Sequence, residues 1–173
     1  MRIVTDAGLR DELLQRMQRD QEVRLSLPKS GPEPEDLMEQ WRSVDADNTT
    51  YLKQVIDEHG WPGYDLVGEN GAQAAWLRAQ HADHDLPFQQ RCLALLHDAV
   101  DRGQAPPRNL AYLVDRVRVG EGRPQVYGTQ YHAPDGVLQP RPIEEPERLD
   151  ERRAEAGLGP HAAYDRSMRQ QYG

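Results

Sequence analysis

Apolar residues recur every three or four positions over most of the chain up to about residue 120, the spacing that places them on one face of an α-helix. The first such stripe contains Leu9, Leu13 and Met17, and Thr5 or Asp6 could cap its helix. Further stripes lie around residues 37–41, 52–56, 72–82, 88–99 and 110–117. The pattern predicts a mainly α protein.

Proline, glycine and capping residues mark where these helices should begin and end. A proline-rich linker is expected from Ser26 to Glu35, and Asp47 is expected to cap a new helix that starts at Asn48. Glycines at 68 and 71 precede the alanine-rich stripe, whose small side chains allow close packing. This stripe therefore predicts the innermost helix.

The pattern changes from helical to alternating at Gln125. Residues 125–132, the turn residues 133–136 and the pair Val137-Leu138 together predict a β-hairpin. The charged tail from Glu144 is expected to hold two short helices. We therefore expect one domain over residues 1–173, a helical bundle with a small β-hairpin packed on it, in which 1–6 and 144–173 could form extended arms.

Composition narrows the function classes. The net charge is −8, which argues against a nucleic-acid partner because phosphate binding needs a basic surface. The single cysteine, Cys92, allows no disulfide framework, so a cytoplasmic, reduced protein is expected. No secretory leader and no run of ~18 apolar residues is present, so no membrane association is expected.

Titratable side chains are most concentrated in the segment Gln80-His81-Ala82-Asp83-His84-Asp85. If the preceding helix continues to Asp85, then His81, His84 and Asp85 stand at i, i+3 and i+4 on one helix face. The alternative for Asp85 is an N-cap, because Leu86-Pro87 follows and proline is favoured in a first helical turn. A second polar group, Asp20, Gln21 and Arg24, is either a solvated helix end or part of a site.

Several polar motifs occur together in an order that is similar to a known family. They are Asp20-Gln21-x-x-Arg24, Gly60-Trp61-Pro62, residues 80–85 with Gln89, Asp115-Arg116, Gln125-x-Tyr127-Gly128-Thr129-Gln130 and Arg153-x-x-x-Gly157-Leu158. From about Asp20 to Leu158 the chain resembles the bacterial domain of unknown function numbered six-six-two-four. The resemblance implies no activity or cofactor, but it implies which polar residues belong to the family pattern. It thereby favours a shared polar site for Asp20, Gln21 and Arg24 over a solvated helix end.

The first functional hypothesis is a small-molecule enzyme with a His/Asp acid–base centre. Imidazole titrates near ~6.5, so His81 or His84 could exchange a proton, and Asp83 or Asp85 could orient the ring. Hydrolysis, elimination, isomerisation or cyclisation, in a specialised biosynthetic pathway, would suit such a centre. The expected catalytic residues are His81, His84, Asp83 and Tyr127. The expected substrate-binding residues are Asp20, Gln21, Arg24, Trp61, Gln80, Arg116, Thr129 and Gln130.

Three alternatives stay open. His81, His84 and Asp85 could hold zinc, iron or manganese, although no cofactor is otherwise expected. The polar residues could instead form a buried, satisfied network without chemistry. Finally, the acidic stretch from Glu33 to Glu39 and the net charge allow a non-catalytic module that binds a protein partner. An enzyme should bring His81, Tyr127 and Arg24 to one cavity.

Overall fold

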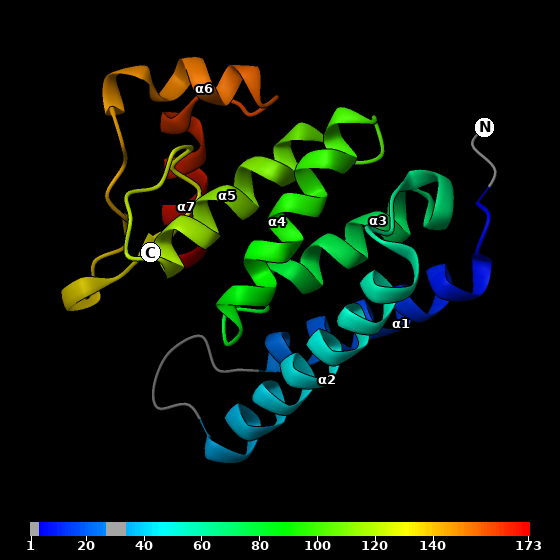
Figure 1. The fold of residues 1–173 in the computed structure, drawn as a ribbon. Coiled ribbons are helices and arrows are strands. Elements are labelled where there is room, and N and C mark those ends of the chain that lie inside the picture. The colour runs from blue at the N-terminus through cyan, green and yellow to red at the C-terminus, as the bar shows by residue number, and fades with distance from the viewer. Residues whose placement is uncertain (1–3, 27–33) are drawn as a thin grey trace. The chain divides into compact units, whose positions relative to one another are not determined.

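α-Helices make up most of the computed structural model, which describes residues 4–26 and 34–173 (Figure 1). The chain divides into two compact units, Met1–Ala105 and Pro106–Gly173. The first contains α1 (Ala7–Ser26), α2 (Glu35–His59), α3 (Tyr64–Gln80) and α4 (Leu86–Asp101). The second contains α5 (Pro107–Gly120), β1 (Tyr131–His132), β2 (Gln139–Pro140), α6 (Leu149–Glu155) and α7 (His161–Tyr172), with short 3-10 turns at Pro134–Gly136 and Pro146–Arg148. The mainly α prediction is confirmed, whereas the expectation of one domain over residues 1–173 stays a prediction.

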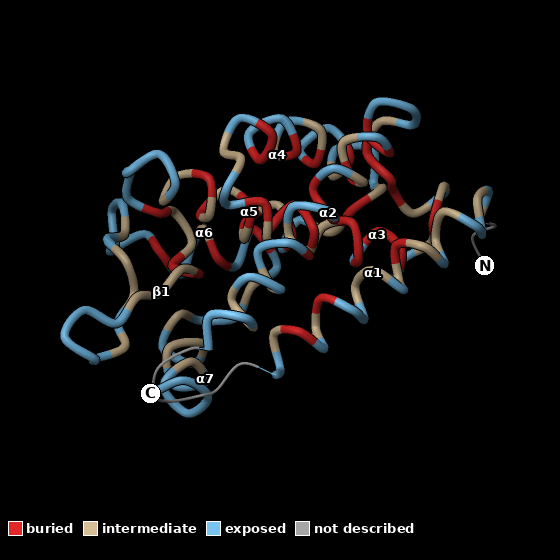
Figure 2. Tube along the Cα trace, turned by 90° about the horizontal axis from the view of Figure 1, so that it is seen from below, coloured by how far each residue is buried: buried red, intermediate tan, exposed pale blue. Residues whose placement is uncertain are grey.

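In the first unit, α3 contacts α1, α2 and α4. Its alanines at 74, 75 and 79 are fully buried, and these small side chains let neighbouring helices approach closely. Figure 2 shows buried residues along α3, whereas α7 contains none. The first turn of α3 is separated from the rest by Gly68, whose φ of 72° interrupts the helix. In the described part of the chain, no helix combines the length and apolarity needed to cross a lipid bilayer.

α2 is one continuous helix of 25 residues, so the helix start predicted at Asn48 is wrong. No proline or glycine interrupts the sequence between Glu35 and His59, and the helix therefore propagates through Asp47. The Asp47 side chain forms an ion pair with Arg16 at 2.7 Å instead of capping a helix. The prediction for the linker falls largely outside the described residues, as does Glu33 of the acidic stretch.

α3 ends at Gln80 and does not continue to Asp85, so the expected common helix face of His81, His84 and Asp85 is wrong. The N-cap alternative for Asp85 is confirmed, because its carboxylate accepts a hydrogen bond from Phe88 N at 3.1 Å. This cap starts α4 and turns the chain between the two helices.

The hairpin of the second unit is shorter than the alternating pattern predicts. Its two strands contain two residues each, and Tyr131 pairs with Pro140 in antiparallel register. Residues 125–130 are not a strand but a loop folded around Asp115 of α5. Asp115 accepts hydrogen bonds from the backbone N–H groups of Val126, Tyr127 and Thr129 at 2.7–2.9 Å, which replace the bonds that a strand would make.

Candidate functional site

Asp20, near the end of α1, accepts several hydrogen bonds although its side chain is only 1% exposed. Arg78 Nη2 donates to its Oδ2 at 3.0 Å, and Arg24 Nε donates to both carboxylate oxygens at 3.1 and 3.2 Å. Gln21 Nε2 donates to Oδ2 at 2.9 Å. These bonds offset the large cost of burying a charge.

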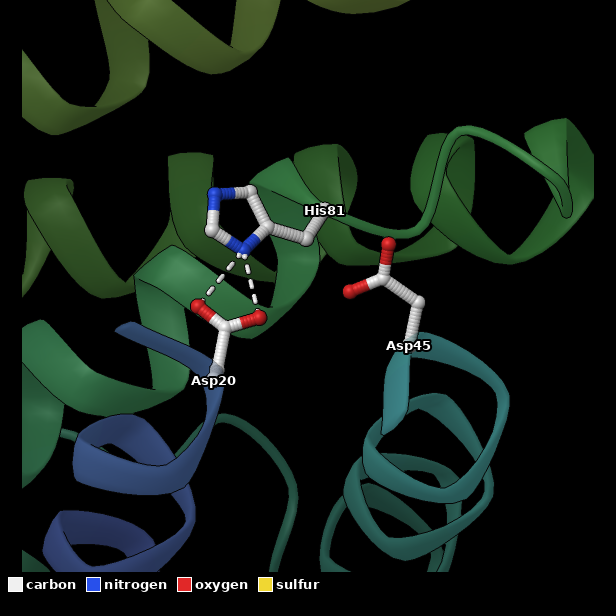
Figure 3. A group of neighbouring side chains, drawn as sticks. All are labelled: Asp20, Asp45 and His81. Atoms are coloured by element: carbon white, nitrogen blue, oxygen red, sulfur yellow. Dashed lines mark hydrogen bonds and ion pairs between the residues drawn. The ribbon is translucent and has the colours of Figure 1, made fainter. Parts of the chain in front are cut away.

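His81, directly after the last residue of α3, completes the surroundings of Asp20. Its Nδ1 lies 3.3 Å from Asp20 Oδ1 and 3.2 Å from Oδ2 (Figure 3). An ionised carboxylate only accepts, so Nδ1 carries the hydrogen in this contact. The other ring nitrogen, Nε2, points away from Asp20 (Figure 3). The neutral ring therefore presents a lone pair on Nε2.

A second carboxylate, Asp45 of α2, lies beside this pair (Figure 3). Arg24 Nη2 donates to Asp45 Oδ1 at 2.8 Å, so one guanidinium bridges Asp20 and Asp45. The same guanidinium stacks over the Trp41 ring, 4.8 Å from its centroid. Arg24 is thereby held in a fixed position between α1 and α2.

Burial and charge move the pKa values of this cluster apart. Burial lowers the pKa of His81, and the guanidiniums of Arg24 and Arg78 lower it further, while Asp20 opposes the shift. Burial acts to raise the pKa of Asp20, but the hydrogen bond from His81 and the cations around it outweigh burial and lower it. Burial raises the pKa of Asp45. At neutral pH the cluster thus holds an ionised Asp20 against a neutral imidazole.

The loop that carries His81 is held by Gln89 of α4. Gln89 is buried, and its Nε2 donates to the carbonyl oxygens of Ala79 and Gln80 and to Asp83 Oδ1, at 3.1–3.2 Å. The end of α3 and the following turn are therefore fixed by one amide group. Gln89, which is part of the sequence motif, thus positions the histidine segment.

The ligand atoms of Asp20, Asp45 and His81 lie within 4.8 Å of one another, close enough to surround a metal ion. Within residues 4–26 and 34–173 no other group of three or more histidine, cysteine, aspartate or glutamate side chains lies so close together. The group contains neither His84 nor Asp85. Carboxylate and imidazole ligands suit zinc, iron or manganese. However, Arg24 and Arg78 already neutralise the two carboxylates, so a cation would have to displace or face two guanidiniums.

The structure brings together four of the predicted residues of the first unit, namely Asp20, Gln21, Arg24 and His81. It places the others of that unit differently. Gln80 and Trp61 are buried, and among the described residues neither Gln80 Nε2 nor Trp61 Nε1 has a hydrogen-bond partner. Asp83 and His84 are exposed, and the Asp83 carboxylate accepts a hydrogen bond from Gln89.

The remaining predicted residues, Arg116, Tyr127, Thr129 and Gln130, belong to the second unit. Thr129 is buried and donates to Asp115 through both its backbone N–H and its hydroxyl, each at 2.9 Å. Gln130 Nε2 donates to Thr129 Oγ1 at 3.1 Å. Thr129 and Gln130 thus support the loop around Asp115. A site shared between these residues and His81 stays a prediction.

The sequence motifs do not include Arg78 and Asp45, two members of the cluster around Asp20. Arg78 stands four residues after Ala74 and three after Ala75, so a charged residue interrupts the buried face of α3. That interruption is a sequence signal for a buried ion pair. Asp45 carries no such signal, because its position depends on α2 running unbroken past residue 48.

Comparison with known proteins gives a family but no activity. A family model described as "Family of unknown function (DUF6624)" matches residues 7–173. No curated protein and no solved structure matches the chain. The family resemblance inferred from the motifs is confirmed, and a functional argument has to come from the site itself.

Proposed function

The chain belongs to the family of unknown function DUF6624, and from the Asp20–His81 pair we propose that it is a small-molecule enzyme in which His81 acts as a general base and acid. One observation carries the proposal: a carboxylate with 1% exposure lies against Nδ1, while Nε2 of the same ring has no hydrogen-bond partner within residues 4–26 and 34–173. In known acid–base centres a carboxylate in this position holds the tautomer and stabilises the imidazolium that forms.

The proposed proton transfer follows from the two ring nitrogens. Nε2 removes a proton from a water molecule or a substrate, while Nδ1–H keeps its contact with Asp20. Arg24 and Arg78 disfavour the resulting imidazolium, so His81 returns the proton readily in the next step. The lowered pKa of His81 keeps the base form populated below neutral pH.

The nearest alternative chemistry, covalent catalysis by cysteine, has little support. Cys92 is fully buried in α4, and burial raises the pKa of its thiol to about 12. The reactive thiolate is therefore scarce. Activation of water or abstraction of a substrate proton by His81 fits the residues better. We include in the proposal a small-molecule substrate, a cytoplasmic location and a role in a bacterial biosynthetic pathway.

The proposal is tested by turnover. The purified protein is incubated with a panel of small esters, lactones and amides and with a metabolite extract, and consumption is followed by mass spectrometry. Because general acid–base catalysis contributes about 10²–10⁴-fold, His81→Gln should lose at least about 100-fold of any activity found.

The matched control is His97→Gln on α4. His97 has a side chain 62% exposed and pairs with the exposed Asp101, so this variant should keep full activity. A folded His81→Gln protein that turns over substrate at the wild-type rate would contradict the proposal.

A metal-dependent enzyme is the second candidate, favoured by the mutual proximity of Asp20, Asp45 and His81. In that case Nδ1 of His81 would be a ligand and would have to lose its hydrogen. Elemental analysis of the untagged protein, with Asp45→Asn as the paired variant, separates the two mechanisms. The acid–base proposal predicts no stoichiometric zinc, iron or manganese, whereas metal lost in Asp45→Asn would favour the second candidate.

A further inference from the structure

A second group of polar side chains lies in the C-terminal unit, where a cavity of about 490 Å³ opens beside α7. Its polar lining comes from Glu147, Asp150, His161, Asp165 and Arg169. Proline and leucine side chains, Pro140, Pro146 and Leu149, supply an apolar wall. The cavity is unconnected with the proposed function of His81, which belongs to the other unit.

His161 is held by a directed chain of hydrogen bonds. The Tyr131 hydroxyl donates to Asp165 Oδ1 at 3.0 Å and lies 3.3 Å from His161 Nε2. Tyr131 has one hydrogen, and an ionised Asp165 can only accept, so the tyrosine oxygen must accept from His161. His161 Nε2 therefore carries the hydrogen, and the neutral ring has its lone pair on Nδ1.

The packing of the ring decides which edge is available to a ligand. A Cβ at Gly128 would lie 2.7 Å from His161 Cδ2 and 2.8 Å from Nε2, so this edge of the ring lies against the Gly128 backbone. The Tyr131 ring lies nearly parallel to the imidazole, with the ring centroids 6.4 Å apart and an interplanar angle of 18°. His161 lines the cavity, and Nδ1 lies on the edge of its ring opposite to the one that faces Gly128.

The other polar groups differ in how far they are already satisfied. Arg169 donates through Nε to Asp165 at 2.8 Å and through Nη1 to Leu138 O at 2.9 Å. Asp150 accepts from the backbone N–H of His161 at 2.7 Å and so compensates the positive end of α7. Among the described residues, the Glu147 side chain has no hydrogen-bond or ion-pair partner. In the part of the chain that the structure describes, the two groups of this cavity without a partner are the Glu147 carboxylate and Nδ1 of His161, and both are acceptors.

We propose that this cavity binds a small organic ammonium ion, which donates hydrogen bonds to His161 Nδ1 and Glu147 while its apolar body lies against Leu149 and the prolines. Three carboxylates and one guanidinium line the cavity, which favours a cation. A metal ion fits less well, because the ligand atoms here are not among those that gather within 4.8 Å in the described chain.

Ligand titration of the full-length, ¹⁵N-labelled protein tests the proposal. Phenethylammonium is the probe, and 2-phenylethanol and phenylacetate are its neutral and anionic counterparts of similar shape. Phenethylammonium should shift amide signals of residues 147–150 and 161–165, and the two counterparts should shift them far less. An equal response to 2-phenylethanol, or no response in these segments, would overturn the proposal.

Two variants sharpen the test. Glu147→Gln removes the unpaired charge and should raise the Kd of phenethylammonium about three- to tenfold. Glu155→Gln, an exposed carboxylate of α6 that does not line the cavity, should leave the Kd unchanged. The proposal fails if the two variants behave alike.

The state of His161 gives a separate readout. Two-bond ¹H–¹⁵N spectra should show hydrogen on Nε2 in the wild type, and Tyr131→Phe should release this preference and weaken phenethylammonium binding. Hydrogen on Nδ1 in the wild type would overturn the proposal. Because the His81 pair lies in the other unit, failure here leaves the proposed acid–base function intact, and failure there leaves this cavity intact.

Discussion

Asp20 shows how a single buried carboxylate organises its surroundings. It accepts hydrogen bonds from two guanidiniums, one amide and one imidazole, and it is almost fully buried. Arg78 is equally buried and has Asp20 as its charged partner. Each charge is tolerated because the other is present. Loss of Asp20 would therefore leave a buried guanidinium without its counter-ion.

Asp20→Asn should lower the free energy of unfolding by about 3–5 kcal/mol, the usual cost of leaving one member of a buried pair uncompensated. Chemical denaturation measures it. Asp47→Asn is the control, because Asp47 pairs with Arg16 from a position 61% exposed and should cost less than about 1 kcal/mol. Similar losses in the two variants would show that the Asp20–Arg78 pair is not stabilising in this way.

His81 should make stability depend on pH near neutrality. Its pKa in the folded protein is lowered, while the unfolded chain has the ordinary value near ~6.5. As pH falls through that value, the unfolded chain takes up a proton that the folded protein refuses, so the free energy of unfolding decreases. Denaturation at about pH 7.5 and pH 5.5 should show this loss, and His81→Gln should reduce it.

At the residue scale, the sequence predicts part of this cluster. The motifs correctly grouped Asp20, Arg24 and His81, because polar residues were considered together across segments. They offered Asp83 or Asp85 to orient the imidazole, whereas the carboxylate that lies against Nδ1 of His81 is Asp20. A partner 61 positions away depends on how α1 packs on α3, which no local pattern contains.

At the scale of elements, capping and helix-breaking residues explain what was predicted. Asp85 and Pro87 correctly marked the start of α4, because both act locally. Asp47 does not cap a helix, because residue types that favour helix starts also occur inside unbroken helices such as α2. The alternation of residues 125–130 predicts a strand, but these residues form a loop. Their backbone bonds to Asp115 depend on a side chain of another element.

Asp115→Asn tests whether that loop depends on one carboxylate. The carboxylate accepts three backbone N–H groups and the Thr129 hydroxyl, and an amide cannot accept all of them. We expect a loss of about 2–3 kcal/mol and faster amide hydrogen exchange at residues 126–129. Asp135→Asn, an exposed residue of the hairpin turn, should leave both quantities unchanged. Unchanged exchange in Asp115→Asn would contradict this account.

At the scale of the whole molecule, the chain contains two compact units with separate polar centres. The mainly α class followed from the helical spacing, but the division into units did not, because the apolar stripes do not specify which helices pack together. We expect the effects of substitution to stay local. Asp20→Asn should raise hydrogen exchange within residues 4–105, and Asp115→Asn within residues 106–173. Exchange that rises equally in both units for either variant would show that they unfold as one.

The protonation state of His81 is the most direct test of the central claim, which is that Asp20 fixes this ring with Nε2 free to act as a base. Two-bond ¹H–¹⁵N spectra of the full-length protein at neutral pH distinguish the two tautomers. The account predicts hydrogen on Nδ1, and Asp20→Asn should weaken that preference while the exposed His97 is unaffected. Hydrogen on Nε2, with Nδ1 unprotonated and facing Asp20, would contradict the account.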